Sequence, residues 1–230
     1  MSAPKIINAT NFDANSLTFS KLSKNPRGAG QIFINGTNKS KVYIRMPYMR
    51  ATFALSEYTD DTSKRTSYSI NLSFNNEDPE LCKIQKTLED FDTMVIKMIA
   101  ENSVEILGQE AEEAEIRKFL YRPLIRKAKK GDYAPTMKLK VYYNSDTKKF
   151  GPEIYNQARQ EVPVDSIEKG QRMAVIFDLC RVWIIDGKIS IDASLHQAML
   201  EPGKKLPPCA FDFGGPSEEG ADESTGDYEE

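Results

Sequence analysis

Residues 173–195, MAVIFDLCRVWIIDGKISIDASL, give the clearest indication of the architecture. This stretch contains two long β-like runs, 173–185 and 188–195 or beyond, joined by Asp186-Gly187. An Asp-Gly pair readily adopts the two positive φ angles that a two-residue type I′ hairpin turn requires. The stretch therefore predicts a long antiparallel hairpin toward the C-terminal end of the chain.

Shorter β-like runs lie in the first third of the chain. The run 41–46 alternates, so that Val42, Ile44 and Met46 share one face while Lys41, Tyr43 and Arg45 share the other. Residues 66–74 alternate in the same way, and this pattern assigns Tyr68 to the core. The run 31–34 ends at Asn35-Gly36, which predicts another hairpin turn.

The middle of the chain has a helical period. Asp78 and Pro79 form a helix start, and apolar residues then recur every three or four positions through about Asn102. A shorter helix is expected over 109–121. From Thr136 the period returns to two, with Met137, Leu139 and Val141 on one face. This order of elements predicts a mainly β fold, a small β-barrel with an inserted helical segment at about 79–121.

The charge is unevenly distributed. The chain has 31 basic and 34 acidic residues, a net charge of −3. Residues 209–230 contain eight of the carboxylates and no Lys or Arg, so residues 1–208 have a net charge of +5. Blocks of like charge are typically disordered interaction tails. We therefore expect a loosely ordered segment at 1–29, a basic domain at 30–208 and a disordered acidic tail at 209–230.

Several classes of protein are not favoured by the composition. The three cysteines form no CxxC pair, which argues for a reducing compartment and against a disulfide framework or a zinc site. The first thirty residues contain no apolar signal region, and no apolar run approaches the length of a membrane span. The sequence therefore predicts a soluble intracellular protein.

Residues 117–149 are rich in both cations and aromatic rings. They contain eleven Lys and Arg residues against two acidic ones, with five Phe and Tyr residues interleaved and Phe150 directly after. Cations follow a phosphate backbone and rings stack on unpaired bases, so this pairing favours single-stranded nucleic acid. The alternative is a solvated basic loop with tyrosines that pack the sheet.

The candidate binding residues divide by chemistry. Phosphate contacts are expected from Arg45, Arg50, Arg126, Lys127, Lys129, Lys130, Lys138 and Lys140. Stacking is expected from Tyr43 and Tyr142, with Tyr133 and Trp183 as further candidates. Trp183 also fits a core position, because a lone tryptophan in a strand more often closes a barrel.

Enzymatic readings have little support. His196 is the one histidine, and no Cys or Ser arrangement indicates a nucleophile with its base. A metal-dependent nuclease would need Asp178, Asp186 and Asp192 to gather a divalent ion. Asp186 is explained by its turn, however, and the other two lie on different strands. We expect no catalytic activity, no metal and no cofactor.

The segments YAPTMKLKV (133–141) and MAVIFDLCRVWIIDGK (173–188) carry a family resemblance. With the acidic tail, they resemble the OB-fold single-stranded DNA-binding proteins of large nucleocytoplasmic DNA viruses, similar in layout to the T7-type phage protein. The resemblance implies an OB barrel and strand coating during replication in a host nucleus or cytoplasmic virus factory. It also implies a tail that competes with DNA and recruits replication proteins. Phage-type tails end in an aromatic residue, whereas here Glu229 and Glu230 follow Tyr228.

Two hypotheses therefore stand. The first is a sequence-tolerant single-stranded DNA-binding protein, for which RNA binding and homo-oligomer formation stay open. The alternative is a protein-interaction or histone-chaperone-like module that acts through its acidic tail. The basic excess of residues 1–208 favours the first.

Overall fold

The computed structural model describes residues 5–128 and 133–202. At its centre is the predicted hairpin, formed by β15 (Arg172–Ile185) and β16 (Lys188–Leu200). The turn residues Asp186 and Gly187 have φ angles of 49° and 70°, as a type I′ turn requires. The hairpin prediction is confirmed.

Five strands form a closed circuit of pairings. β5 (Tyr43–Ala51) pairs with β15, and β15 with β16. β16 meets β10 (Thr136–Val141) in parallel at Lys140 and Ser194. β10 pairs with β7 (Thr66–Ser73), which returns to β5. The mainly β prediction is confirmed, and this circuit is what a five-stranded OB-like barrel requires.

The interior of the circuit holds the alternating apolar side chains. Ile44, Ile70, Leu139 and Phe177 are fully buried there. Because successive side chains of a strand point to opposite faces, the residues between these positions face outward. Arg45, Lys138 and Lys140 are among the charged residues that lie on this outward face.

Residues 5–29 are more structured than the expected loosely ordered segment. β1 (Ile6–Asn8) pairs with β5, while β2 (Thr18–Phe19) and β3 (Ser23–Lys24) pair with β4 (Gly30–Asn35). Between them lie the 3-10 turns η1 (Ala9–Asn11) and η2 (Ala14–Ser16). The segment is held because Phe12 and Leu17 are buried, with the Phe12 ring 6.0 Å from that of Phe91.

The hairpin expected at Asn35-Gly36 is absent from the described residues, so that prediction is wrong. β4 pairs instead with the far part of β15, where Phe33 lies opposite Arg181. The 3-10 turn η3 (Thr37–Lys39) then leads to β5. A partner distant in sequence has replaced the local one, and β4 extends the sheet beside β15.

The helical insertion begins as predicted. α1 (Pro79–Glu101) is capped by Asp78, whose Oδ1 accepts from the backbone N–H groups of Glu80 and Leu81. α2 (Ser103–Leu107) follows. The second helix is shorter than expected, since only α3 (Glu113–Glu115) and the π-helix η4 (Ile116–Leu120) form.

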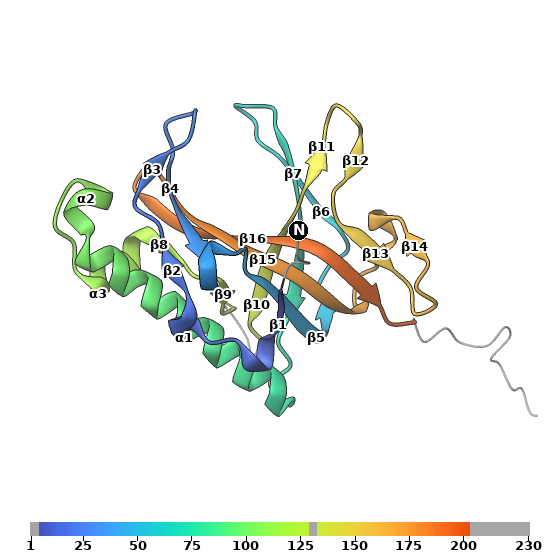
Figure 1. Ribbon diagram of the computed structural model, residues 1–230. Helices are drawn as coiled ribbons and strands as arrows, with labels where there is room; N and C mark the ends of the chain where they lie inside the picture. The colour runs from blue at the N-terminus through green and yellow to red at the C-terminus, as the bar shows by residue number, and fades with distance from the viewer. Residues whose placement is uncertain (1–4, 129–132, 203–230) are drawn as a thin grey trace, which may run out of the picture.

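Short strands and turns complete the sheet and its loops. They are β6 (Ser56–Thr59), β8 (Tyr121–Arg122), β9 (Ile125–Arg126), β11 (Tyr143–Asn144), β12 (Lys149–Phe150), β13 (Glu153–Tyr155), β14 (Glu161–Val162) and the 3-10 turn η5 (Val164–Ser166). In Figure 1 the β3–β4, β6–β7 and β11–β12 hairpins project from one side of the molecule, while α1 crosses the opposite side. In the described parts of the chain, no helix combines the length and apolar character needed to cross a membrane.

A buried carboxylate joins α1 to the segment that precedes β10. Asp92 accepts hydrogen bonds from the Tyr121 hydroxyl and from the Leu124 backbone N–H, the latter at 2.9 Å. Burial raises the pKa of Asp92 to about 6, against the opposing effect of these hydrogen bonds. The contact fixes β8 and β9 against the helix.

This carboxylate makes stability depend on pH. Because its folded pKa lies above the unfolded value, the folded state binds the proton more tightly, and stability from this group rises as pH falls through about 6. Relative to Asp92→Asn, the wild type should gain about 1 kcal/mol of unfolding free energy between pH 7 and pH 5. Denaturant unfolding at both pH values measures this. An equal pH dependence in the two proteins would contradict the assignment.

Candidate nucleic-acid interface

A cavity of about 590 Å³ lies on the outward face of the sheet. It is lined by residues of β7, β8, β9, β10, β15 and β16, together with Tyr142 and Tyr143. We call it the basic groove, because five of its lining residues are cations: Arg122, Arg126, Lys138, Lys140 and Arg181.

The alternation of β10 sets the floor of the basic groove. Met137 and Leu139 are fully buried, so Lys138 and Lys140 point outward. Tyr142 follows the strand on the same face, and 64% of its surface is exposed. The sequence predicted this combination of two cations and a ring correctly as an outward face.

Positive charge is concentrated around Lys138. Burial lowers the pKa of Lys138, and the neighbouring charges of Arg126, Lys140 and Arg122 lower it further. Of the groove-lining residues in the described parts of the chain, Asp192 alone carries a carboxylate. A site in which cations repel one another is stabilised when an anion binds.

Asp192 acts as an internal counter-charge. Its Oδ1 lies 2.7 Å from Lys140 Nζ, and its Oδ2 lies 3.6 Å from Arg181 Nε. The indole N–H of Trp183 donates to the same Oδ2 at 3.2 Å. Asp192 therefore fixes three side chains on this face, and Lys140 is already partly neutralised.

A β-bulge turns Arg181 and Trp183 outward. Val175, Phe177 and Leu179 are buried, so a regular strand would also bury residues 181 and 183. The register shifts between Leu179 and Arg181, and Val182 takes the buried position instead. Trp183 is consequently half-buried on the outward face rather than in the core.

Further rings lie beside the groove. Tyr68, which the sequence assigned to the core, is half-buried and lines the groove, packed against Tyr143 and Phe150 at 5.2 and 5.1 Å. Tyr58 is exposed opposite Ser67, another lining residue. Alternation alone could not identify either ring, because both depend on which strands become neighbours.

The candidate residues on β5 lie elsewhere. Tyr43 packs edge-on against His196 at 5.0 Å, and Arg45 donates to Asn8 at 2.8 Å. Both line hollows shared with Ile176 and Gln197, outside the basic groove. Arg50 lies near Gly170.

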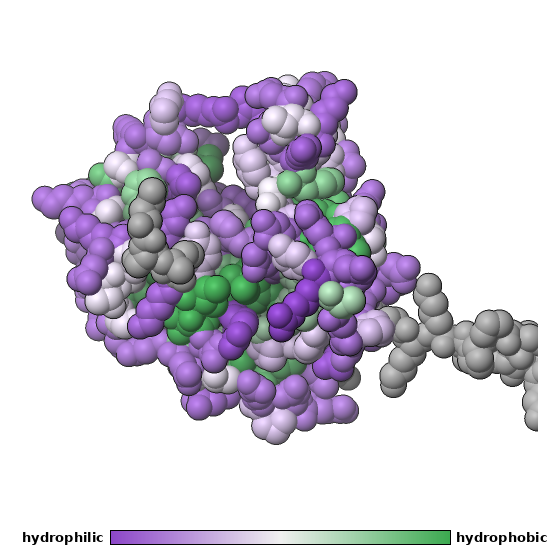
Figure 2. Space-filling model, turned by 45° about the vertical axis from the view of Figure 1, so that its right-hand side comes forward, coloured by the Kyte–Doolittle hydropathy of each residue, from purple (hydrophilic) through white to green (hydrophobic). Residues whose placement is uncertain are grey.

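Figure 2 shows an apolar area framed by hydrophilic residues on the face turned to the viewer.

Three of the remaining candidates lie near the end of β9 or the start of β10. Arg126 lines the groove and Lys127 follows it in the chain, exposed. Tyr133 is also exposed, just before β10. Lys129 and Lys130 lie outside the described residues, as does the acidic tail at 209–230.

The candidate metal ligands do not meet. Asp178 pairs with His196 at 3.0 Å, whereas Asp192 faces the groove cations. Within residues 5–128 and 133–202, no group of three or more His, Cys, Asp or Glu side chains could hold a metal ion. The arrangement gives the nuclease alternative no support.

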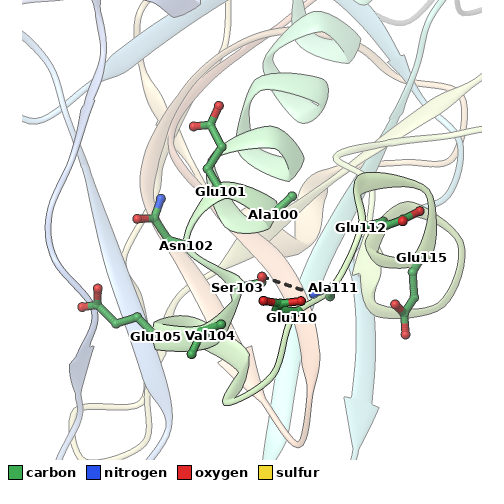
Figure 3. A pocket seen from close by; sticks show the side chains of 10 residues that line it. All are labelled: Ala100, Glu101, Asn102, Ser103, Val104, Glu105, Glu110, Ala111, Glu112 and Glu115. Atoms are coloured by element: carbon green, nitrogen blue, oxygen red, sulfur yellow. Dashed lines mark hydrogen bonds between the residues drawn. The ribbon is translucent and has the colours of Figure 1, made fainter.

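A separate acidic hollow of about 900 Å³ lies at the end of α1 (Figure 3). Glutamates from α1, α2, α3 and the loop before α3 surround it, and Ser103 Oγ accepts from the Ala111 N–H at 3.2 Å. Its charge is opposite to that of the basic groove, so a polyanion would be repelled there.

Comparison with known proteins finds only distant structural similarity. No family model and no curated protein sequence matches the chain. Gp2.5, a single-stranded DNA-binding protein encoded by bacteriophage T7, is 15% identical, covers 76% of this chain and 98% of its own, and gives a TM-score of 0.48. The single-stranded DNA-binding protein from bacteriophage Enc34, in complex with ssDNA, is 12% identical over 80% of this chain and 97% of its own, with a TM-score of 0.46.

A C-terminal truncation of the Enc34 protein is 13% identical, with coverages of 84% and 99% and a TM-score of 0.47. Similarities at this level assign no activity, so the case for a ligand rests on the residues of this chain. The proteins named here come from bacteriophages. The attribution to large nucleocytoplasmic DNA viruses gains no support from them and stays a prediction.

The charge repulsion in the groove can be tested directly. Arg126→Gln should raise the pKa of Lys138, because it removes one of the positive charges that lower it. An NMR titration of the Lys138 side chain measures the change. Lys97→Gln is the matched control, since Lys97 lies on α1 in an exposed pair with Glu101. An unchanged pKa in Arg126→Gln would mean that Arg126 does not contribute to the shift.

Proposed function

We propose that this protein is a sequence-tolerant single-stranded DNA-binding protein without catalytic activity. It would coat and protect single strands in replication, recombination or repair. One observation carries the proposal: cations converge around Lys138 on an outward sheet face that also presents Tyr142. The cations would hold phosphates and the ring would stack on a base.

The mixture of groups favours a single strand over a duplex. Tyr142 and Tyr68 lie beside the cations. Rings in this position can stack only on bases whose faces are free, and the bases of a duplex have no free faces. Phosphate contacts carry no sequence information, and every base has a face on which to stack. Sequence tolerance follows from both properties.

The phage proteins named above are described as single-stranded DNA-binding proteins, one of them in complex with ssDNA. Their class agrees with the proposal. With TM-scores below 0.5, they add no argument to it.

We assign the acidic tail a regulatory part in the same proposal. Its eight carboxylates would compete with DNA for the basic groove and, once displaced, recruit replication proteins. Tail-dependent binding to basic proteins with no affinity for single strands would instead support the interaction-module alternative.

Removing groove cations should weaken DNA binding in a salt-dependent way. Log affinity falls linearly as log salt rises. In Lys138→Gln and Arg126→Gln this dependence should become weaker, and the magnitude of the slope should decrease by about 0.7 for each phosphate that the variant no longer neutralises. Fluorescence anisotropy with a labelled oligothymidine at several salt concentrations measures the slope. Lys97→Gln should keep the wild-type slope. Equal slopes in the wild type and all three variants would contradict the assignment of the groove as the binding site.

Removing the exposed ring should weaken binding at every salt concentration. Tyr142→Ala should lower affinity about tenfold, in the range expected when one stacked base is no longer held, while Tyr142→Phe should bind as the wild type does. The same anisotropy assay reports both. If Tyr142→Ala also binds normally, Tyr142 is not a stacking residue.

Deleting residues 209–230 should tighten DNA binding, most strongly at low salt, because an internal anion is removed. A full-length variant with the tail carboxylates changed to amides should match the deletion. A scrambled tail of unchanged composition should match the wild type. Equal affinities for wild type and deletion would contradict tail competition.

A further inference from the structure

An aromatic and cationic cluster lies where β15 meets β4, beyond the groove floor. We call it the Arg181 platform and define it as Phe33, Arg181, Trp183 and Asp192. Phe33 lies directly opposite Arg181 in the β4–β15 ladder. The sequence indicated Trp183 as a stacking candidate but not Phe33, because Phe33 and Arg181 are far apart in the chain.

The contacts of Arg181 make the platform rigid. Its guanidinium carbon lies 5.3 Å from the centre of the Phe33 ring and 4.9 Å from the centre of the Trp183 ring. Its Nη1 donates to Gln31 Oε1 at 2.9 Å. Asp192 accepts from the Trp183 indole, so the second ring is held as well.

The fold does not require these rings on the surface. Ile32 and Ile34 of β4 supply the buried contacts, with exposures of 1% and 3%, while Phe33 between them is 37% exposed. Phe33 therefore contributes little to the core, and its ring is accessible to a ligand.

The platform is continuous with the basic groove. Arg181 and Asp192 line the groove and also belong to the platform. From β10 to β4 a ligand would cross β16 and β15, three inter-strand steps of about 4.8 Å each. The β3–β4 hairpin stands at this end of the sheet, on the side from which the β6–β7 and β11–β12 hairpins also project (Figure 1).

We propose that the Arg181 platform is a second base-stacking site, which extends the path of the single strand from β10 across β16 and β15 to Phe33 on β4. The ligand class is a single-stranded polynucleotide: the rings take nucleobases, and Arg181 takes a phosphate. Asp192 is a positioning residue, since it holds Trp183 and Arg181 in place. The inference rests on the proposed function and adds to it the direction of the bound strand.

Trp183 is the only tryptophan of the chain, so it reports directly on its own site. Titration of the full-length protein with an oligothymidine of about 15 nucleotides should quench tryptophan emission, in parallel with the anisotropy of a labelled strand. Phe33→Ala should weaken binding about tenfold, and Phe33→Tyr should restore it.

Phe53→Ala is the matched control, because Phe53 is also exposed with a cation, Lys169, 6.0 Å from its ring centre, but lies outside the groove lining. It should bind like the wild type. Circular dichroism checks that each variant is folded, and wild-type quenching tests the site even if Phe33→Ala does not fold.

Two negative results have different meanings. If the strand binds but tryptophan emission stays constant and Phe33→Ala binds normally, the platform is not part of the path, and the proposed function stands. If the wild-type protein binds no oligonucleotide at all, the proposed function fails and the platform assignment fails with it.

Discussion

The pairing of β15 with β16 organises the sheet and both of its faces. β15 also pairs with β5 and β4, and β16 with β10, β8 and β13, so the other strands of the sheet are attached to this hairpin directly or through these five. The Asp186-Gly187 turn fixes the register at one end. Since register decides which face each side chain occupies, the turn sets the faces of residues 181–185 and 188–192, as far as the register shift in β15.

The bulge in β15 gives one strand two functions. Before it, Val175 and Phe177 fill the core; after it, Arg181 and Trp183 face outward while Val182 takes over the interior. An unbulged strand would bury a guanidinium, which is strongly unfavourable without a partner. The irregularity therefore belongs to the site, and it places Arg181 where Phe33, Trp183 and Asp192 can all contact it.

The sequence predicted those features that depend on local pattern. Alternation correctly turned Lys138, Lys140 and Tyr142 outward, and the turn chemistry correctly joined the two long strands. Alternation cannot show in which direction an outward face points around a closed sheet. Tyr43 and Arg45 therefore had the expected chemistry but line other hollows. The bulge, the β4–β15 pairing and the groove position of Tyr68 arise from contacts between distant residues, which a single sequence does not display.

The cations of the groove fall into two groups, which differ in whether a carboxylate lies close to them. Asp192 is buried and close to Lys140 and Arg181, so its interactions are weakly screened by salt. The outer cations Arg122, Arg126 and Lys138 have no comparable partner among the described residues, and their attraction for a polyanion is exposed to screening. A bound strand would thus meet a fixed inner cluster, whose charge Asp192 partly neutralises, and an outer group of cations that attracts it. The inner cluster would set where the rings stack, whereas the outer group would set how strongly binding depends on salt.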